Sequence, residues 1–168
     1  MVTNAETTNP AAAISPPGLR TGWRSGPKPK RRPANGYAGK FSTPYCIAAG
    51  FTRGNVGLSD FSDSAVRDPA VLALAAKVRY RIDPSNPYPK NFTGHIRATL
   101  RDGSAVEERQ PYMRGGAQEP LSDDEITRKF VDNAVYGGWT RDQALGFAAE
   151  CAGLFEADRP SLFLSSRR

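Results

Sequence analysis

Three side chains between residues 40 and 45 have the chemical types needed to bind an anion and move a proton. Lys40, Ser42 and Tyr45 supply an ammonium, a hydroxyl and a phenol within a short stretch of chain. Pro44 lies two residues after Ser42, and a proline close to a hydroxyl residue is typical of a helix start. Because the N-terminus of a helix carries partial positive charge, these side chains form a candidate site for a carboxylate.

A structural interpretation competes with this candidate site. Ser42 is also expected if it only caps the helix, and Tyr45 if its ring only packs in the core. The small residues at 48–50 let the helix approach a neighbouring element closely in either case. We add Arg114 to the candidate site as a second cation that could bind a carboxylate.

Other catalytic chemistries find little support in the sequence. His95 is the only histidine, and it alternates onto the polar side of an expected strand. One histidine and two distant cysteines, Cys46 and Cys151, do not form a metal-binding pattern, so we expect no metal and no cofactor. Both cysteines fall in apolar helical patterns, which predicts buried free thiols and a reducing cytoplasmic location.

The net charge of +6 belongs to the beginning of the chain. Residues 1–40 contain seven basic residues and one acidic residue, whereas residues 41–168 contain 16 of each. Prolines and glycines interrupt residues 1–38, which show no sustained periodicity, so we expect a disordered basic tail. The basic run at 28–32 offers a contact for nucleic acid or an import address. A solvated tail is the preferred interpretation, because no aromatic residues interleave with these charges.

From residue 39 the chain shows the periodicities of a folded domain. Apolar residues predict helices at about 43–53 and 69–76, and they alternate with polar residues over 78–82 and 92–100, as in half-buried strands. No apolar run approaches the ~20 residues that a membrane span requires. The chain also begins without the apolar segment of a secretion signal.

Asp102 and Gly103 predict a hairpin turn after the second strand. A two-residue loop would place Val106 opposite Thr99 on the polar face. A three-residue loop, with Gly103 in the left-handed region, places Val106 opposite Ala98 on the core face. We expect the three-residue loop, because burial of one face sets the register of a strand pair.

Two helices are expected to close the chain. Their starts are marked by two capping-box pairs, Ser122 with Glu125 and Thr140 with Gln143. The apolar faces are expected to be those of Ile126, Phe130 and Ala134 in the first helix, and Ala144, Leu145, Ala148, Cys151 and Phe155 in the second. Helices at both ends of an antiparallel meander predict one α+β domain over 39–168, with helices packed on one face of the sheet.

Three stretches, taken in order, resemble the C-terminal domain of the MmgE/PrpD family. The first begins with KFSTPYCIAAG at 40–50 and continues to Phe61. The second begins with DPAVLALA at 68–75 and leads into the strand at Val78. The third begins with TLRDG at 99–103, continues through Arg114 and ends in PLSDDE and KF. The resemblance covers about residues 27–157.

The resemblance implies an activity and a set of site residues. The family includes 2-methylcitrate dehydratase, cis-aconitate decarboxylase and iminodisuccinate epimerase, which are cofactor-free enzymes that move protons on small di- and tricarboxylates. Tyr45 matches the tyrosine of the family's S-x-x-Y motif, which implies that it is the catalytic residue from this domain. Ser42 and Lys40 match its neighbours in that motif.

The chain differs from the family in length. Family members carry a large N-terminal helical domain that supplies most of the acid–base and carboxylate-binding residues, and residues 1–26 do not resemble it. We therefore expect a truncated or stand-alone domain, with Tyr45 lining half of a pocket whose other wall is missing. The resemblance is to a carbon–oxygen lyase, but the helical domain with most of the catalytic residues is missing. Loss of part of a catalytic unit removes most of the rate, so the sequence does not decide whether this chain is an enzyme.

The expected partners follow from this missing wall. An exposed docking surface predicts a separate helical chain or a second copy of this chain, with a small carboxylate as substrate once the site is complete. Two alternatives remain open: a small binding protein whose basic tail contacts nucleic acid, and a non-catalytic interaction module.

Overall fold

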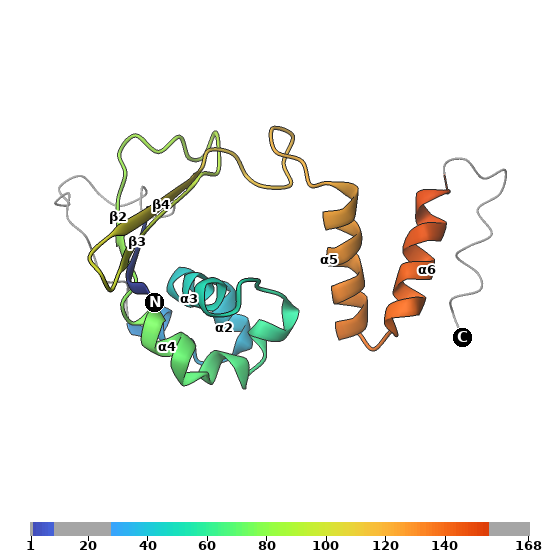
Figure 1. Cartoon of the computed structure of the whole chain (residues 1–168), viewed down its shortest axis with the longest axis horizontal. Coiled ribbons are helices and arrows are strands. Elements are labelled where there is room, and N and C mark those ends of the chain that lie inside the picture. Colours follow the sequence, from blue (N-terminus) through green and yellow to red (C-terminus); the bar gives the residue numbers. More distant parts are fainter. Residues whose placement is uncertain (1, 9–27, 155–168) are drawn as a thin grey trace. The chain divides into compact units, whose positions relative to one another are not determined.

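The computed structural model describes residues 2–8 and 28–154 of the chain. The chain divides into two compact units, Met1–Pro120 and Leu121–Arg168, here called the first and the second unit. Figure 1 shows a sheet with several helices in the first unit and a pair of helices in the second. The single folded domain over 39–168 that the sequence indicated stays a prediction.

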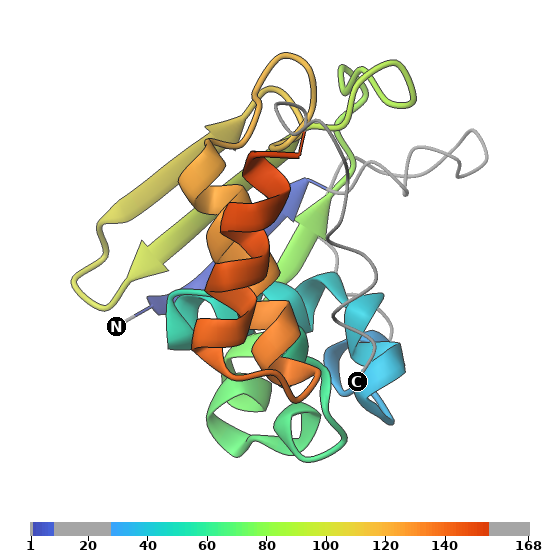
Figure 2. The same cartoon turned by 90° about the vertical axis from the view of Figure 1, so that its right-hand side faces the viewer.

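The first unit is built on a four-stranded sheet in the order β2-β1-β3-β4 (Figure 2). Its strands are β1 (Val2–Thr8), β2 (Arg79–Arg81), β3 (Gly94–Leu100) and β4 (Ala105–Gln110). β1 pairs in parallel with β2 and antiparallel with β3, whereas β3 and β4 form an antiparallel hairpin. The α+β class is confirmed. The sheet is not a simple meander, because β1 lies between β2 and β3. β1 forms backbone hydrogen bonds with both neighbours.

The disordered tail expected over 1–38 is corrected where the structure describes it. β1 occupies residues 2–8, and two short helices follow, α1 (Lys28–Arg31) and α2 (Gly36–Lys40). α2 is held in place by long-range contacts, since the backbone N–H of Gly36 donates to Asp63 Oδ1 at 2.8 Å. Composition does not reveal such contacts. The remaining part of the expected tail, residues 9–27, lies outside the described residues.

The two helices expected in the middle of the chain are confirmed as α3 (Thr43–Arg53) and α4 (Pro69–Ala75). Ser42 caps α3 by accepting a hydrogen bond from the Tyr45 N–H at 3.0 Å. Gly54 ends the same helix in the left-handed region with φ of 78°, a conformation that favours glycine. Between α3 and α4, two short 3₁₀ helices, η2 (Leu58–Phe61) and η3 (Ala65–Arg67), carry the chain around α3.

The core of the first unit lies among its helices. Residues of α3, η3 and α4 form one fully buried cluster, which consists of Tyr45, Ala48, Ala49, Val66, Val71 and Ala75. α2, α3 and α4 lie on one side of the sheet (Figure 1), and α4 contacts β1. The helices of this unit therefore cover one face of the sheet, as expected.

The β3–β4 hairpin has the register expected from its turn. Val106 pairs with Ala98, and Gly103 has a φ of 85°. The three-residue loop is therefore confirmed. Val106 is nevertheless 56% exposed, whereas Ala98 is 3% exposed. β4 is the edge strand of the sheet, so it has a neighbouring strand on one side only.

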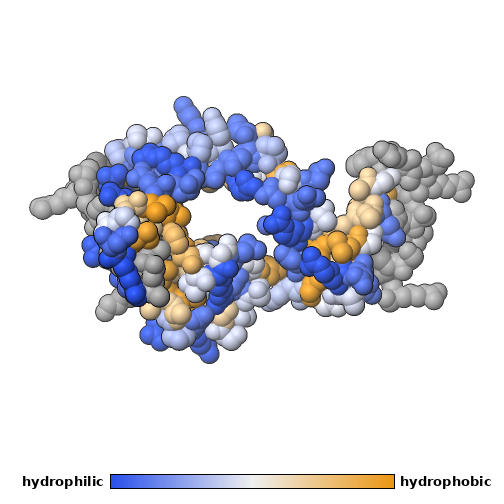
Figure 3. Space-filling view, viewed as in Figure 1, coloured by the Kyte–Doolittle hydropathy of each residue, from blue (hydrophilic) through white to orange (hydrophobic). Residues whose placement is uncertain are grey.

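The second unit contains α5 (Asp123–Tyr136) and α6 (Arg141–Ala152). Both expected capping boxes form. Val131 and Ala144 are buried, but two residues of the expected apolar faces, Ile126 and Leu145, are 53% and 42% exposed. Hydrophobic side chains gather between the two helices (Figure 3). Phe155, the last residue of the expected face, lies outside the described residues.

An aromatic cluster joins α5 and α6. The rings of Phe130 and Phe147 stack at a centroid distance of 5.8 Å, and Trp139 meets both rings edge-on.

Within residues 2–8 and 28–154, no helix has the length and apolar character needed to cross a membrane.

Candidate functional site

The Tyr45 ring is fully buried, at 0% exposure. Its hydroxyl donates a hydrogen bond of 2.5 Å to the backbone carbonyl of Asp60, and its ring lies 6.1 Å from that of Phe61. Burial raises the pKa of the phenol above its ordinary value of 10.0, because the phenolate would lose its hydration. This position differs from the expected half-open pocket, because residues of η2 cover the ring.

Ser42 is also fully buried, and both of its hydrogen-bonding roles are structural. Its hydroxyl oxygen accepts the Tyr45 N–H at the start of α3, and its hydroxyl donates to the backbone carbonyl of Lys30. Ser42 therefore caps α3 and ties it to α1. In this arrangement the side chain has no face open to a substrate.

The two expected cations lie at the surface, on different elements. Lys40 is the exposed last residue of α2. Arg114 lies in the loop after β4, where its guanidinium is 3.2 Å from Glu119 Oε1. The structure thus brings Ser42 and Tyr45 together. The cation that acts most strongly on the Tyr45 phenol is a different one, Arg53.

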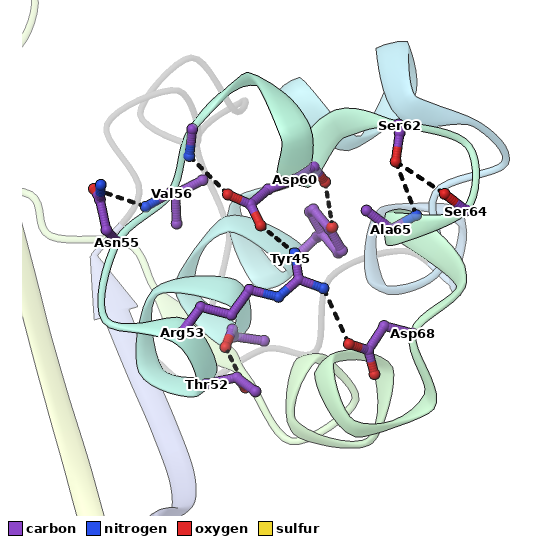
Figure 4. A network of polar contacts seen from close by, with 12 residues as sticks. Tyr45, Thr52, Arg53, Asn55, Val56, Asp60, Ser62, Ser64, Ala65 and Asp68 are labelled. Carbon is purple, nitrogen blue, oxygen red and sulfur yellow. Dashed lines mark hydrogen bonds and ion pairs between the residues drawn. The ribbon is translucent and has the colours of Figure 1, made fainter. Parts of the chain in front are cut away.

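Arg53 forms an ion-pair network that the sequence did not predict (Figure 4). Its guanidinium pairs with the carboxylate of Asp60 and lies 3.0 Å from Asp68 Oδ2. Asp60 is only 7% exposed, and its other carboxylate oxygen accepts the Gly57 N–H at 2.7 Å. The network therefore joins the end of α3 to η2 and to the start of α4, and it holds η2 over Tyr45.

The charges of this network compensate one another. The hydrogen bonds that Arg53 donates to Asp60, the larger effect, and to Asp68 raise the pKa of Arg53. The hydrogen bond from Arg53 lowers the pKa of Asp68 below its ordinary value of 3.8, and the Ala70 N–H adds to this effect. In the sequence, Arg53 fits a basic residue at the end of one helix and Asp68 fits the cap of the next helix. Because each has a local explanation, nothing in the sequence indicated that they meet.

The Asp68 contact predicts a pH-dependent stability. Because the pKa of Asp68 is lower in the folded protein, its contribution is complete above pH 3.8 and is lost as the pH falls through the folded value. The variant Asp68→Asn should therefore unfold at lower urea concentration than the unsubstituted chain at pH 7. The difference should shrink towards pH 3. A difference that stays constant between pH 7 and pH 3 would contradict the ion pair.

A second polar region surrounds His95 at one end of the β3–β4 hairpin. His95 Nε2 is 2.7 Å from Glu107 Oε1, which also accepts a hydrogen bond from Arg109. The hydrogen bonds with His95, the larger effect, and with Arg109 lower the pKa of Glu107. An adjoining cleft of about 240 Å³ is lined by residues that include Asp83, Asn86 and Thr93. Its polar side chains satisfy one another, since Asp83 accepts from Ser85 and Asn86 donates to Thr93. His95 thus has a structural role here.

Both cysteines are free thiols, and both are half-buried. Burial raises the pKa of the Cys46 thiol above its ordinary value of 9.0, which keeps it protonated and weakly reactive. In the described part of the chain, no three His, Cys, Asp or Glu side chains lie close enough to hold a metal ion.

Comparison with known proteins gives a consistent result. The profile of the MmgE/PrpD C-terminal domain matches residues 12–149. Cis-aconitate decarboxylase of Mus musculus is 31% identical over 104 residues, which is 61% of this chain and 21% of that protein. Cis-aconitate decarboxylase of Homo sapiens is 27% identical over 103 residues, with the same shares. The matched region thus spans about a fifth of the length of these curated relatives.

Proposed function

Because the chain belongs to the MmgE/PrpD family, we propose that it is the C-terminal domain of a lyase or isomerase of small di- or tricarboxylates. The observation that carries this proposal is the profile match, which extends through both units of the structure. Two relatives are named cis-aconitate decarboxylase, and their names supply the substrate class that we transfer to this chain.

We propose that these 168 residues need further polypeptide for catalysis. Reactions next to a carboxylate require a group that moves a proton and cations that hold the acid. The Tyr45 hydroxyl is buried and bonded to a backbone carbonyl, which leaves it out of reach of a substrate. Participation of Tyr45 therefore requires that a docked helical domain shift η2 and uncover the ring.

An exposed aromatic pair supports such docking. Tyr37 and Phe41 are 72% and 59% exposed, and their rings meet edge-on at 5.2 Å. Tyr37 belongs to α2 and Phe41 is the C-cap residue of that helix, just before the start of α3. Large exposed aromatic side chains are typical of surfaces that bind another protein. We propose that this pair contacts the helical domain, supplied in the same polypeptide or as a separate chain.

The proposal predicts that the purified chain alone has no measurable turnover of cis-aconitate or 2-methylcitrate. A family member shortened to its helical domain, without its own C-terminal domain, should be inactive alone. Adding the present chain to it should restore turnover. Tyr45→Phe should then lower the restored rate at least about 100-fold, as for loss of a general acid or base. The rate can be followed by the absorbance of the conjugated alkene.

Tyr136→Phe is the matched control, because it also removes one phenol hydroxyl, but from a ring of α5 that is 57% exposed and has no proposed role in docking. It should leave the restored rate unchanged. Failure of the folded chain to restore turnover would contradict its role as the C-terminal domain. Restoration that is insensitive to Tyr45→Phe would contradict only the role of Tyr45.

A further inference from the structure

A second cavity lies in the first unit, between the loop after α1 and the segment from η3 to α4. It has a volume of about 330 Å³, and it is lined by Arg32, Pro33, Ala34, Val66, Arg67 and Leu72. Pro33 and Val66 are buried, Leu72 is half-buried, and both arginines are exposed. The cavity therefore combines an apolar floor with two cationic groups, and none of the described residues that line it is acidic.

Neither arginine of this cavity forms an ion pair with any residue in 2–8 or 28–154. The carboxylates closest to Arg67 in sequence are already occupied. Asp63 accepts the Gly36 N–H at 2.8 Å, and Asp68 is bound by Arg53 at 3.0 Å. Two guanidiniums thus face the same cavity without a compensating charge from the described chain.

The neighbouring residue adds to this positive charge. The Nε–H of Arg31 is buried and has no hydrogen-bond partner among the described residues. Burying a charged donor without a partner is unfavourable, and an anion bound nearby reduces that cost through its opposite charge. The segment that carries Arg31 and Arg32 is therefore better suited to a bound anion than to an empty cavity.

We propose that this cavity binds a small organic anion, with its carboxylate or phosphate group held by Arg32 and Arg67. The planar guanidinium offers paired N–H donors that match the oxygens of either group. The apolar floor then contacts the hydrocarbon part of the ligand. The volume falls at the lower end of the range for small-molecule sites. This site does not depend on the proposed lyase function, because neither arginine belongs to the candidate catalytic residues.

The shape of the site distinguishes a small anion from nucleic acid. Nucleic-acid binding draws on several phosphates at once and needs an extended row of cations. This cavity has two arginines beside a buried apolar floor, which a phosphate backbone would leave unused. An oligonucleotide is therefore the comparison ligand, and its tight binding would count against the proposal.

The test is calorimetric titration of the full chain with butyrate, butyl phosphate, inorganic phosphate and a single-stranded oligonucleotide. Butyrate and butyl phosphate represent the two head groups with the same hydrocarbon part. We expect at least one of them to bind more tightly than inorganic phosphate. Arg32→Gln and Arg67→Gln should each weaken that binding by roughly 10-fold or more, as for loss of a charge-assisted hydrogen bond. Arg128→Gln, an exposed arginine of α5, is the matched control and should have no effect.

A further variant tests the space in the cavity independently of the charge of its arginines. Ala34→Phe fills the cavity and keeps both arginines, so it should abolish binding of the alkyl anion. Circular dichroism and melting temperature confirm that each variant is folded. Absence of binding by both alkyl anions would overturn the proposal, as would binding that is insensitive to both arginine variants. Preferred binding of the oligonucleotide, unaffected by Ala34→Phe, would overturn it in favour of a basic surface.

Discussion

Replacing Tyr45 by alanine is expected to lower the free energy of unfolding by about 3–5 kcal/mol, the usual range for truncating a buried aromatic side chain. The ring is fully buried in the core cluster of the first unit and contacts Phe61. The variant would also leave the buried carbonyl of Asp60 without its hydrogen-bond donor. Small domains have a total stability of about 5–15 kcal/mol, so the variant should be close to unfolding.

Urea denaturation followed by circular dichroism measures this loss. Tyr37→Ala is the control, since its ring is 72% exposed and its removal should change the free energy by about 0.5 kcal/mol or less. Tyr45→Phe should fall between them, with a loss of about 1 kcal/mol for the missing hydroxyl. Equal effects of the two alanine variants would contradict the buried position of Tyr45.

Gly36→Ala is expected to destabilise the chain by about 3 kcal/mol, at the upper end for overpacking. A Cβ at this position would lie 1.7 Å from the backbone carbonyl oxygen of Phe61. Backbone atoms cannot rotate away as side chains do, so α2 would have to move off η2. The movement would also break the hydrogen bond from the Gly36 N–H to Asp63.

Gly57→Ala is the matched control for this prediction. Gly57 lies in the same unit and has a φ of −123°, and a Cβ added to it would meet no described atom within 4 Å. An added methyl group there should be neutral or should raise the stability by about 0.4–1 kcal/mol, because it restricts the unfolded chain. Thermal unfolding of both variants tests the pair. Equal melting temperatures would contradict the close contact between α2 and η2.

Local signals in the sequence predicted most of the helices and one turn. Ser42, Asp68, Ser122 and Thr140 each cap the helix that was expected to follow them. The hairpin register followed from Gly103, whose φ of 85° fits the three-residue loop. These features could be predicted because their determining contacts lie within a few residues of one another.

Contacts between distant residues were not predictable in the same way. Residues 2–8 have no alternating apolar pattern, yet they form β1, because β2 and β3 both offer unpaired backbone groups. Arg53 meets Asp60 and Asp68 only after the chain has turned through η2 and η3. Neither residue type nor spacing distinguishes these charges from ordinary surface charges.

The sequence by itself determined the family, the capped start of α3 and the chemical identity of the candidate residues. Only the tertiary structure decided the surroundings of those residues. A tyrosine in the first turn of a helix has the same sequence signal whether its ring is open or covered. Here the carbonyl of Asp60 and the ring of Phe61 cover it, because Arg53 draws η2 against α3 through an ion pair that only the folded chain can form.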